Sequence, residues 1–282
     1  MTASARPKLR DVIARYGLDA RRSLGQHFLL DGNLTSRIVR EAEPLNGRHV
    51  IEVGPGPGGL TRALLETAAS SVTAVEIDPR AAAAMRELSA EAAGRLAVIE
   101  SDALGVDFSS LVPPPRQIIA SLPYNIATPL LVGWLRQAGS FEALTLMFQL
   151  EVAERICAVP GTPAYGRLSV LAQWVADVAI RFRLPPEAFV PPPKVWSAVV
   201  SVRPHAMQPD PMLFAAMERL TAAAFGQRRK MLRGALRSLG GERLLAEVEI
   251  AADRRAETLD VGAFDRLARR LAAADVSSCF RP

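Results

Sequence analysis

The sequence predicts an α/β fold, in which a doubly wound parallel sheet is followed by a small all-helical C-terminal domain. Between residues 48 and 151, short apolar runs alternate with segments of helical spacing. Strands joined by crossover helices produce this pattern. From about Pro204 the helical spacing continues without a strand pattern. We therefore expect two domains, a sheet domain over residues 1–203 and a helical domain over residues 204–282.

Each expected element follows from its own local pattern. Short apolar runs predict strands at residues 48–54, 72–78, 95–101, 116–121 and 143–151. Helical spacing predicts helices at residues 9–17, 33–42, 59–69, 79–94, 128–137, 151–159, 166–178, 212–240 and 261–274. Two further apolar runs, at 179–184 and 197–204, flank a proline-dense segment. We expect these two runs to extend the sheet as an antiparallel pair.

The composition limits the class of protein. Of 282 residues, 49% are hydrophobic and 22% are charged, which is ordinary for a globular protein. The net charge of +5 is compatible with nucleic-acid binding and with a solvated basic surface. Two distant cysteines and three scattered histidines predict no metal site. Because the N-terminus lacks an apolar core and no apolar run approaches about 18 residues, we expect no signal peptide, no membrane span and a cytoplasmic location.

A glycine-rich loop joins the first strand of the alternating region to a helix. Gly54, Gly56 and Gly59 match the spacing G-x-G-x-x-G. Such a loop can receive the pyrophosphate of a dinucleotide, or can let the backbone approach S-adenosylmethionine, which has no phosphate. The loop could also be a tight turn without a ligand.

Acidic residues at successive strand ends favour S-adenosylmethionine. Glu76 ends the second strand, where a carboxylate can accept both ribose hydroxyls, and Asp102 follows the third, where it can accept from an adenine amino group. Glu52 lies inside the loop motif EVGPGPGG, where a negative charge would repel a pyrophosphate but would suit a sulfonium or ammonium cation. The sheet is therefore expected to be a Rossmann-like methyltransferase sheet.

The segment Ser121-Leu-Pro-Tyr124 follows the fourth strand and is similar to the loop of methyltransferases that modify exocyclic amino groups. The N6 nitrogen of adenine is a poor nucleophile because its lone pair is delocalised into the ring. The Ser121 side chain and the Leu122 carbonyl can accept its two N–H bonds and favour a pyramidal geometry. The Tyr124 ring can stack on the target base.

Several segments together resemble the ribosomal RNA small-subunit adenine N6,N6-dimethyltransferase family, over about residues 8–230. They are SLGQHFLLD, EVGPGPGGLT, VEID, SLPYNIATP, AYGRLSVLAQ, FVPPPKVWSAVV and FGQRRKML, in chain order. The resemblance implies dimethylation of two adjacent adenosines in a hairpin loop near the 3′ end of 16S rRNA, a role in subunit biogenesis, and a monomer that acts on the 30S subunit or its precursor. It implies that residues 1–203 bind the cofactor and catalyse transfer, and that residues 204–282 contact the ribosome.

The resemblance also implies roles for individual residues. The expected cofactor-binding residues are His27, Leu29, Gly54, Glu76, Asp102 and Ser121. The expected catalytic residues are Ser121, Leu122, Pro123, Tyr124 and Phe189, of which Phe189 would face the target base. The family usually has Asn where this chain has Ser121; because Ser occurs in the wider amino-methyltransferase pattern, activity is still expected. Basic residues expected to contact RNA phosphates are Arg21, Arg22, Arg228, Arg229 and Lys230.

Three alternatives stay open at this point. The chain could be a related adenine methyltransferase that acts on large-subunit RNA, a non-enzymatic rRNA-binding assembly or transcription factor, or a nicotinamide dehydrogenase. The proline segment and helical tail argue against the first, and the presence of Glu76, Asp102 and Tyr124 against the second. Binding of S-adenosylmethionine rather than NAD would exclude the third.

Overall fold

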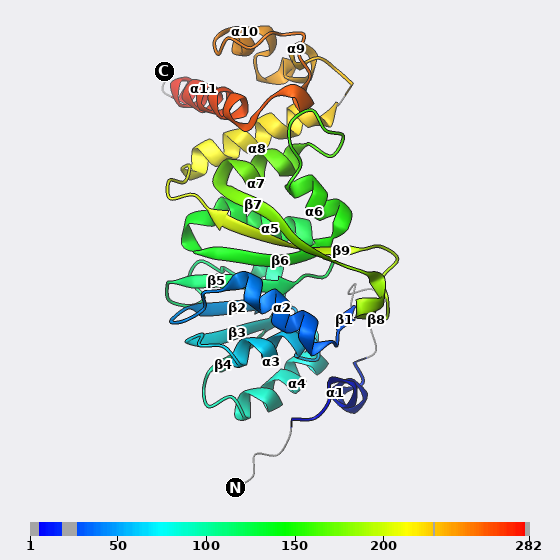
Figure 1. Cartoon of the computed structure of the whole chain (residues 1–282). Helices are drawn as coiled ribbons and strands as arrows, with labels where there is room; N and C mark the ends of the chain where they lie inside the picture. The colour runs from blue at the N-terminus through cyan, green and yellow to red at the C-terminus, as the bar shows by residue number, and fades with distance from the viewer. Residues whose placement is uncertain (1–5, 19–26, 228, 280–282) are drawn as a thin grey trace. The chain divides into compact units, whose positions relative to one another are not determined.

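The computed structural model describes residues 6–18, 27–227 and 229–279. A seven-stranded sheet has the order β4-β3-β2-β5-β6-β9-β7 (Figure 1). The pairs β4-β3, β3-β2, β2-β5 and β5-β6 are parallel, and β9 runs antiparallel to β6. This arrangement confirms the predicted α/β class, and both late apolar runs join the sheet.

The strands are short and their bounds agree with the apolar runs. The sheet consists of β2 (His49–Val53), β3 (Ser71–Glu76), β4 (Leu96–Glu100), β5 (Arg116–Ser121), β6 (Ala143–Gln149), β7 (Ala176–Leu184) and β9 (Ser197–Pro204). The strand β7 begins at Ala176, earlier than expected, because alternation between buried and less buried residues already starts there.

Helices occupy the crossovers and the C-terminal part. They are α1 (Leu9–Tyr16), α2 (Gly32–Ala42), α3 (Gly59–Leu65), α4 (Pro79–Ala90), α5 (Ala127–Arg136), α6 (Leu150–Ile156), α7 (Arg167–Val175), α8 (Pro211–Gly226), α9 (Leu232–Ala235), α10 (Gly241–Ala246) and α11 (Val261–Cys279). None of the helices in the described ranges is both long and apolar enough to cross a membrane.

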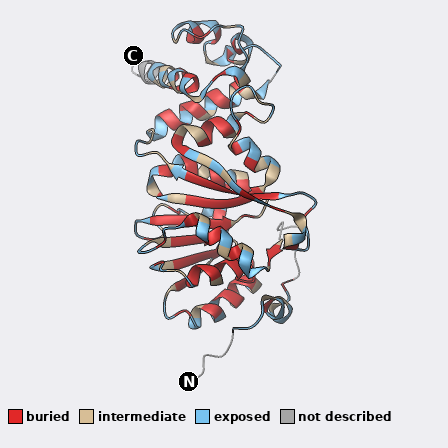
Figure 2. Cartoon of the chain, viewed as in Figure 1, coloured by how far each residue is buried: buried red, intermediate tan, exposed pale blue. Residues whose placement is uncertain are grey.

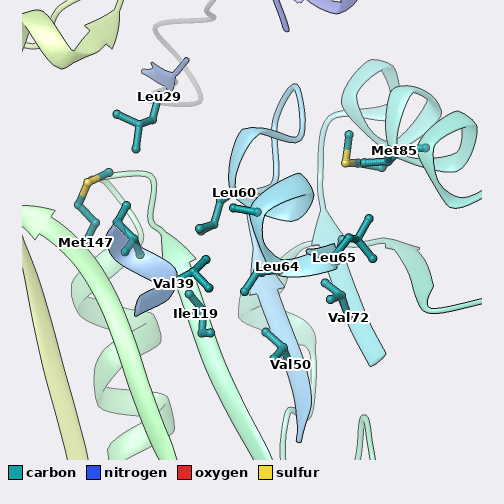
Figure 3. Close-up of a cluster of buried hydrophobic side chains, with 14 of the residues drawn as sticks. Leu29, Val39, Val50, Leu60, Leu64, Leu65, Val72, Met85, Ile119 and Met147 are labelled. Atoms are coloured by element: carbon teal, nitrogen blue, oxygen red, sulfur yellow. The ribbon is translucent and has the colours of Figure 1, made fainter. Parts of the chain in front are cut away.

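The central strands are buried on both faces, as expected for parallel strands covered by helices (Figure 2). One cluster of buried side chains combines residues of the strands with residues of α2, α3 and α4 (Figure 3). Val50, Ile119 and Leu64 belong to it, and all three are fully buried. Burial of an aliphatic side chain of this size contributes about 1.5–3 kcal/mol. The cluster therefore fixes the strand ends from which the site is built.

A second, two-stranded sheet was not predicted. The strands β1 (Phe28–Leu29) and β8 (Phe189–Val190) pair antiparallel, with Phe28 opposite Val190 and Leu29 opposite Phe189. Strands of two residues carry no periodicity that a sequence pattern could reveal. The pairing holds the segment before α2 against the segment before β9.

Alpha-carbon contacts divide the chain into two compact units. The first comprises Met1–Ala153 and Ala179–Arg203, and the second comprises Glu154–Val178 and Pro204–Pro282. Inside the second unit, the Trp174 indole N–H donates to Asp265 at 2.9 Å, and the rings of Phe225 and Phe264 stack at 5.5 Å. The functional division after residue 203 stays a prediction.

Candidate functional site

A cavity of about 280 Å³ lies in the first unit, beside the carboxyl ends of β2, β3 and β5. In the strand order, β2 lies between β3 and β5. The chain adds β3 and β4 on one side of β2, and then β5 and β6 on the other side. Open α/β sheets bind ligands at such a switch point. The cavity is lined by every residue predicted to bind cofactor or to act in catalysis: His27, Leu29, Gly54, Glu76, Asp102, Ser121, Leu122, Pro123, Tyr124 and Phe189. Their proximity is a structural result, and their roles stay predictions.

The glycine loop approaches the catalytic loop closely. Gly54 has a φ of +70°, and a β-carbon at this position would lie 3.5 Å from the ring of Pro123. Gly59 begins α3, where a β-carbon would lie only 2.7 Å from the Leu29 carbonyl oxygen. Glycine at these two positions thus lets three segments converge on the cavity.

Glu76 is buried at the end of β3, with 5% of its surface exposed. Its Oε2 accepts from the backbone N–H of Gly56 at 3.2 Å, and its Oε1 accepts from the N–H of Asp78 at 2.9 Å. Burial raises the pKa of Glu76, and these two hydrogen bonds oppose the rise. Each carboxylate oxygen can accept a further hydrogen bond, so the side chain can order the glycine loop and bind ligand hydroxyls.

Glu52 is the most unusual charged group in the site. It lines the cavity with 1% of its surface exposed, and its Oε2 has no hydrogen-bond partner among the described residues. Burial raises the pKa of Glu52 to about 8; the charge of Glu76 adds to the rise, while hydrogen bonds from Thr61 oppose it. Buried acceptors without a partner are rare in native proteins. This oxygen is therefore suited to a donor or a cation that a ligand would bring.

The other acid, Asp102, lies at the exposed rim of the cavity. Its Oδ1 accepts from the N–H of Leu104 at 2.9 Å, which caps the short 3-10 helix Ala103–Gly105. Ile77 also lines the cavity and is 49% exposed, a high value for a large apolar residue. The sequence reasoning missed Ile77; its place between two acids at a strand end was the available signal.

Aromatic rings form the other end of the cavity. The Tyr124 hydroxyl and Ser197 Oγ are hydrogen-bonded at 2.7 Å, and burial raises the pKa of Tyr124. The His27 and Tyr124 rings lie 5.6 Å apart, and Phe189 is 2% exposed. His27 Nδ1 lies 2.8 Å from the Pro191 carbonyl oxygen, so this nitrogen carries the proton, because a carbonyl can only accept. Ser121 ends β5 opposite Met147 of β6.

These residues fit S-adenosylmethionine better than a dinucleotide. The cavity brings together Glu52, whose buried Oε2 has no partner among the described residues, Glu76, which accepts a hydrogen bond from the glycine loop, and several apolar side chains. Among the described residues that line it, there is no Lys or Arg that could balance a pyrophosphate. A cationic ligand with an amino-acid end and a ribose matches this set of donors and acceptors.

The residues expected to contact RNA are only partly described. Arg21, Arg22 and Arg228 lie outside the described residues. Arg229 and Lys230 are exposed in the second unit and are not among the residues that line the cavity. Their contact with RNA stays a prediction.

Comparison with known families gives a match over most of the chain. Residues 17–273 match the family model for ribosomal RNA adenine dimethylase. The chain is 63% identical over 262 residues to a ribosomal RNA small subunit methyltransferase A of Gluconobacter oxydans, covering 93% of this chain and 86% of the relative. It is 54% identical over 269 residues to a protein of the same name from Rhodospirillum rubrum, covering 95% and 93%.

Solved structures give a consistent comparison. A dimethyladenosine transferase from Plasmodium falciparum superposes with a TM-score of 0.72 at 25% identity, covering 86% of this chain and 96% of that one. The 23S rRNA methyltransferase ErmE superposes with a TM-score of 0.64 at 28% identity, covering 86% and 99%.

Proposed function

Because the chain belongs to the ribosomal RNA adenine dimethylase family, we propose that it dimethylates the N6 amines of two adjacent adenosines in a hairpin loop near the 3′ end of 16S rRNA. The protein is an rRNA adenine dimethyltransferase. The observation that carries the detailed proposal is one cavity lined both by the buried acids Glu52 and Glu76 and by aromatic rings.

The carboxylate end of the cavity would hold S-adenosylmethionine. Glu76 would accept the ribose hydroxyls, Asp102 the adenine amino group, and Gly54 would face the methionine part. The unpartnered Oε2 of Glu52 would face the positive charge. Leu29 of β1 and His27, which directly precedes β1, would cover the ligand. When bound, S-adenosylmethionine supplies an electrophilic methyl group on a sulfonium.

The aromatic end would position the target adenine. The Ser121 hydroxyl and the Leu122 carbonyl would accept the two N–H bonds of the amine, which localises the nitrogen lone pair. Tyr124 and Phe189 would hold the base by its faces after it leaves the RNA stack. Ser197 fixes the Tyr124 hydroxyl, so the ring has little freedom to turn. In-line transfer depends mainly on such positioning, because orientation alone can supply a large part of a rate enhancement.

After the first methylation the amine keeps a single N–H. Either Ser121 or Leu122 must then release its hydrogen bond, and the monomethylated base must remain long enough to turn its nitrogen again toward the methyl group. Contacts of the base with Tyr124 and Phe189 would favour this retention. We propose that the second methylation depends more strongly than the first on Ser121.

The rRNA would be presented within the 30S subunit or its precursor, and the protein would act as a cytoplasmic monomer. The phosphates would contact Arg21 and Arg22 near the N-terminus, and Arg228, Arg229 and Lys230 in the C-terminal part of the chain. The likeness to a 23S rRNA methyltransferase keeps large-subunit RNA as a second candidate substrate.

Methyl transfer to isolated subunits tests the proposal. Small and large subunits from cells that lack this activity are incubated separately with the protein and labelled S-adenosylmethionine, and NAD serves as the control ligand in a binding titration. Label in the small-subunit RNA alone is expected. Label in the large-subunit RNA alone would favour the second candidate, and binding of NAD instead of S-adenosylmethionine would contradict the cofactor.

A further inference from the structure

Trp196 differs from the other two tryptophans of the chain in its exposure. Trp134 is buried, with 2% of its surface exposed, and Trp174 is partly buried and donates its indole N–H to Asp265. Trp196 is 48% exposed, and its indole N–H has no hydrogen-bond partner in the described part of the chain. Two neighbours along the chain, Val190 and Val195, are also exposed, at 46% and 44%.

The segment from Pro191 to Trp196, here called the proline loop, is fixed at both ends. At its start, Val190 pairs with Phe28, and the Pro191 carbonyl accepts from His27. At its end, the Trp196 carbonyl accepts from the N–H of Leu150 at 2.8 Å. Three consecutive prolines further restrict the backbone between these ends. The loop thus holds an exposed aromatic residue with little conformational freedom left to lose on binding.

The proline loop adjoins the aromatic end of the cavity. Two residues close to its ends belong to the proposed base site: Phe189, two positions before Pro191, lines the cavity, and Ser197, directly after Trp196, is hydrogen-bonded to the Tyr124 hydroxyl. Ser197 also lies opposite Gln149 at the carboxyl end of β6, the sheet edge at which β5 presents Ser121. Trp196 is therefore adjacent in the chain to Ser197, which fixes the Tyr124 ring.

On the basis of the proposed function, we propose that Trp196 is a stacking platform for an unpaired nucleotide of the substrate RNA next to the target adenosine. A base needs only one ring face, and stacking on an aromatic side chain tolerates any base. Lys194 in the same loop is exposed and has no ion pair with any described residue, so a cation is available for the adjoining phosphate. A protein partner would need a larger apolar surface than three side chains, because stable interfaces bury about 800 Å² on each partner.

Substitutions at Trp196 test whether stacking occurs. Loss of one base stack corresponds to roughly a 5- to 150-fold loss in RNA affinity. We therefore expect Trp196→Ala to weaken binding of protein-free small-subunit rRNA and of 30S subunits by about tenfold or more. Trp196→Phe should restore most of the affinity and Trp196→Leu should not, because only Phe offers a ring face. Cofactor affinity should be unchanged in all three, and Met207→Ala, at another exposed apolar residue, is the control.

Fluorescence gives a readout that does not depend on methylation. Because Trp196 is the most exposed of the three tryptophans, bound RNA should quench the emission of the wild-type protein and not that of Trp196→Phe. Unchanged RNA affinity in Trp196→Ala, or full rescue by Leu, would overturn the proposal. A loss seen with 30S subunits but not with protein-free rRNA would overturn it in favour of a ribosomal-protein contact. Quenching without methyl transfer by the wild type would support Trp196 while contradicting the proposed function.

Discussion

Replacement of Glu52 by Gln should make the ligand-free protein more stable at neutral and alkaline pH. Gln keeps the shape of the side chain but removes a carboxyl whose pKa burial raises to about 8. Between the ordinary pKa of 4.5 and about 8, the folded protein keeps a proton that the unfolded chain has lost. The stability tied to this proton is complete below pH 4.5 and decreases as the pH rises toward 8.

The size of the effect follows from the width of this pH window. Each unit of pH within it lowers the free energy of unfolding of the wild type by about 1.4 kcal/mol through Glu52, and the whole window corresponds to about 4–5 kcal/mol. Glu76, the other ionisable group that acts on Glu52, is present in both proteins, so the difference between them mainly reports Glu52.

Urea denaturation at a series of pH values from 5 to 8, without ligand, measures this difference. We expect the stability of Glu52→Gln minus that of the wild type to increase with pH over the series. The same substitution should weaken binding of S-adenosylmethionine at pH 8, and calorimetry in buffers of different ionisation enthalpy should show proton release at pH 7 for the wild type only. A stability difference that does not vary with pH would refute the assignment of a raised pKa to Glu52.

Three further predictions concern the catalytic loop, the glycine loop and the basic surface. Ser121→Ala should lower turnover by roughly ten- to a hundredfold with little loss of RNA affinity, since one hydrogen bond that strengthens in the transition state is lost. Ser121→Asn should keep or raise turnover. Single-turnover assays should count mono- and dimethyladenosine separately, and equal counts for the Ala variant and the wild type would contradict a catalytic role of Ser121. Gly59→Ala should lower the free energy of unfolding by about 1–3 kcal/mol, because the new β-carbon meets the Leu29 carbonyl at 2.7 Å; Gly133→Ala in α5, which meets no atom within 4 Å, is the matched control, and equal melting temperatures for the two variants would contradict the close approach. Changing Arg229 and Lys230 to Ala should weaken the salt dependence of subunit binding and leave cofactor affinity intact. If the slope of binding affinity against salt concentration does not change, these two residues do not contact RNA phosphates.

Much of the sheet and its acidic strand ends could be predicted from local pattern. Glu76 and Asp102 were placed at the cavity because parallel strands end at one edge of a sheet, and alternation of strand and helix indicated parallel strands. The glycine spacing correctly indicated a sharp turn, although only the structure shows that Gly59 is needed for the Leu29 carbonyl. The local sequence was sufficient to predict those features of the fold and the site that depend only on periodicity and on position along a strand.

Other features depend on contacts between distant segments and could not be predicted. The pairing of Leu29 with Phe189 joins residues far apart in the chain through strands too short to show a pattern. The hydrogen bond between Tyr124 and Ser197 likewise follows from tertiary packing, as does the burial of Glu52 Oε2 without a partner among the described residues. For the same reason, the sequence assigned no role to Ile77 or Trp196, whose exposure is known only from the folded chain.

Mass mapping of the methylated RNA tests the central claim most directly. Small subunits that lack the modification are incubated with the protein and methyl-deuterated S-adenosylmethionine, and nuclease fragments of the 16S rRNA are sequenced by mass. The site described here predicts two labelled methyl groups on each of two adjacent adenosines in the hairpin loop near the 3′ end. Unlabelled fragments from this loop, or label confined to other nucleotides, would contradict the claim.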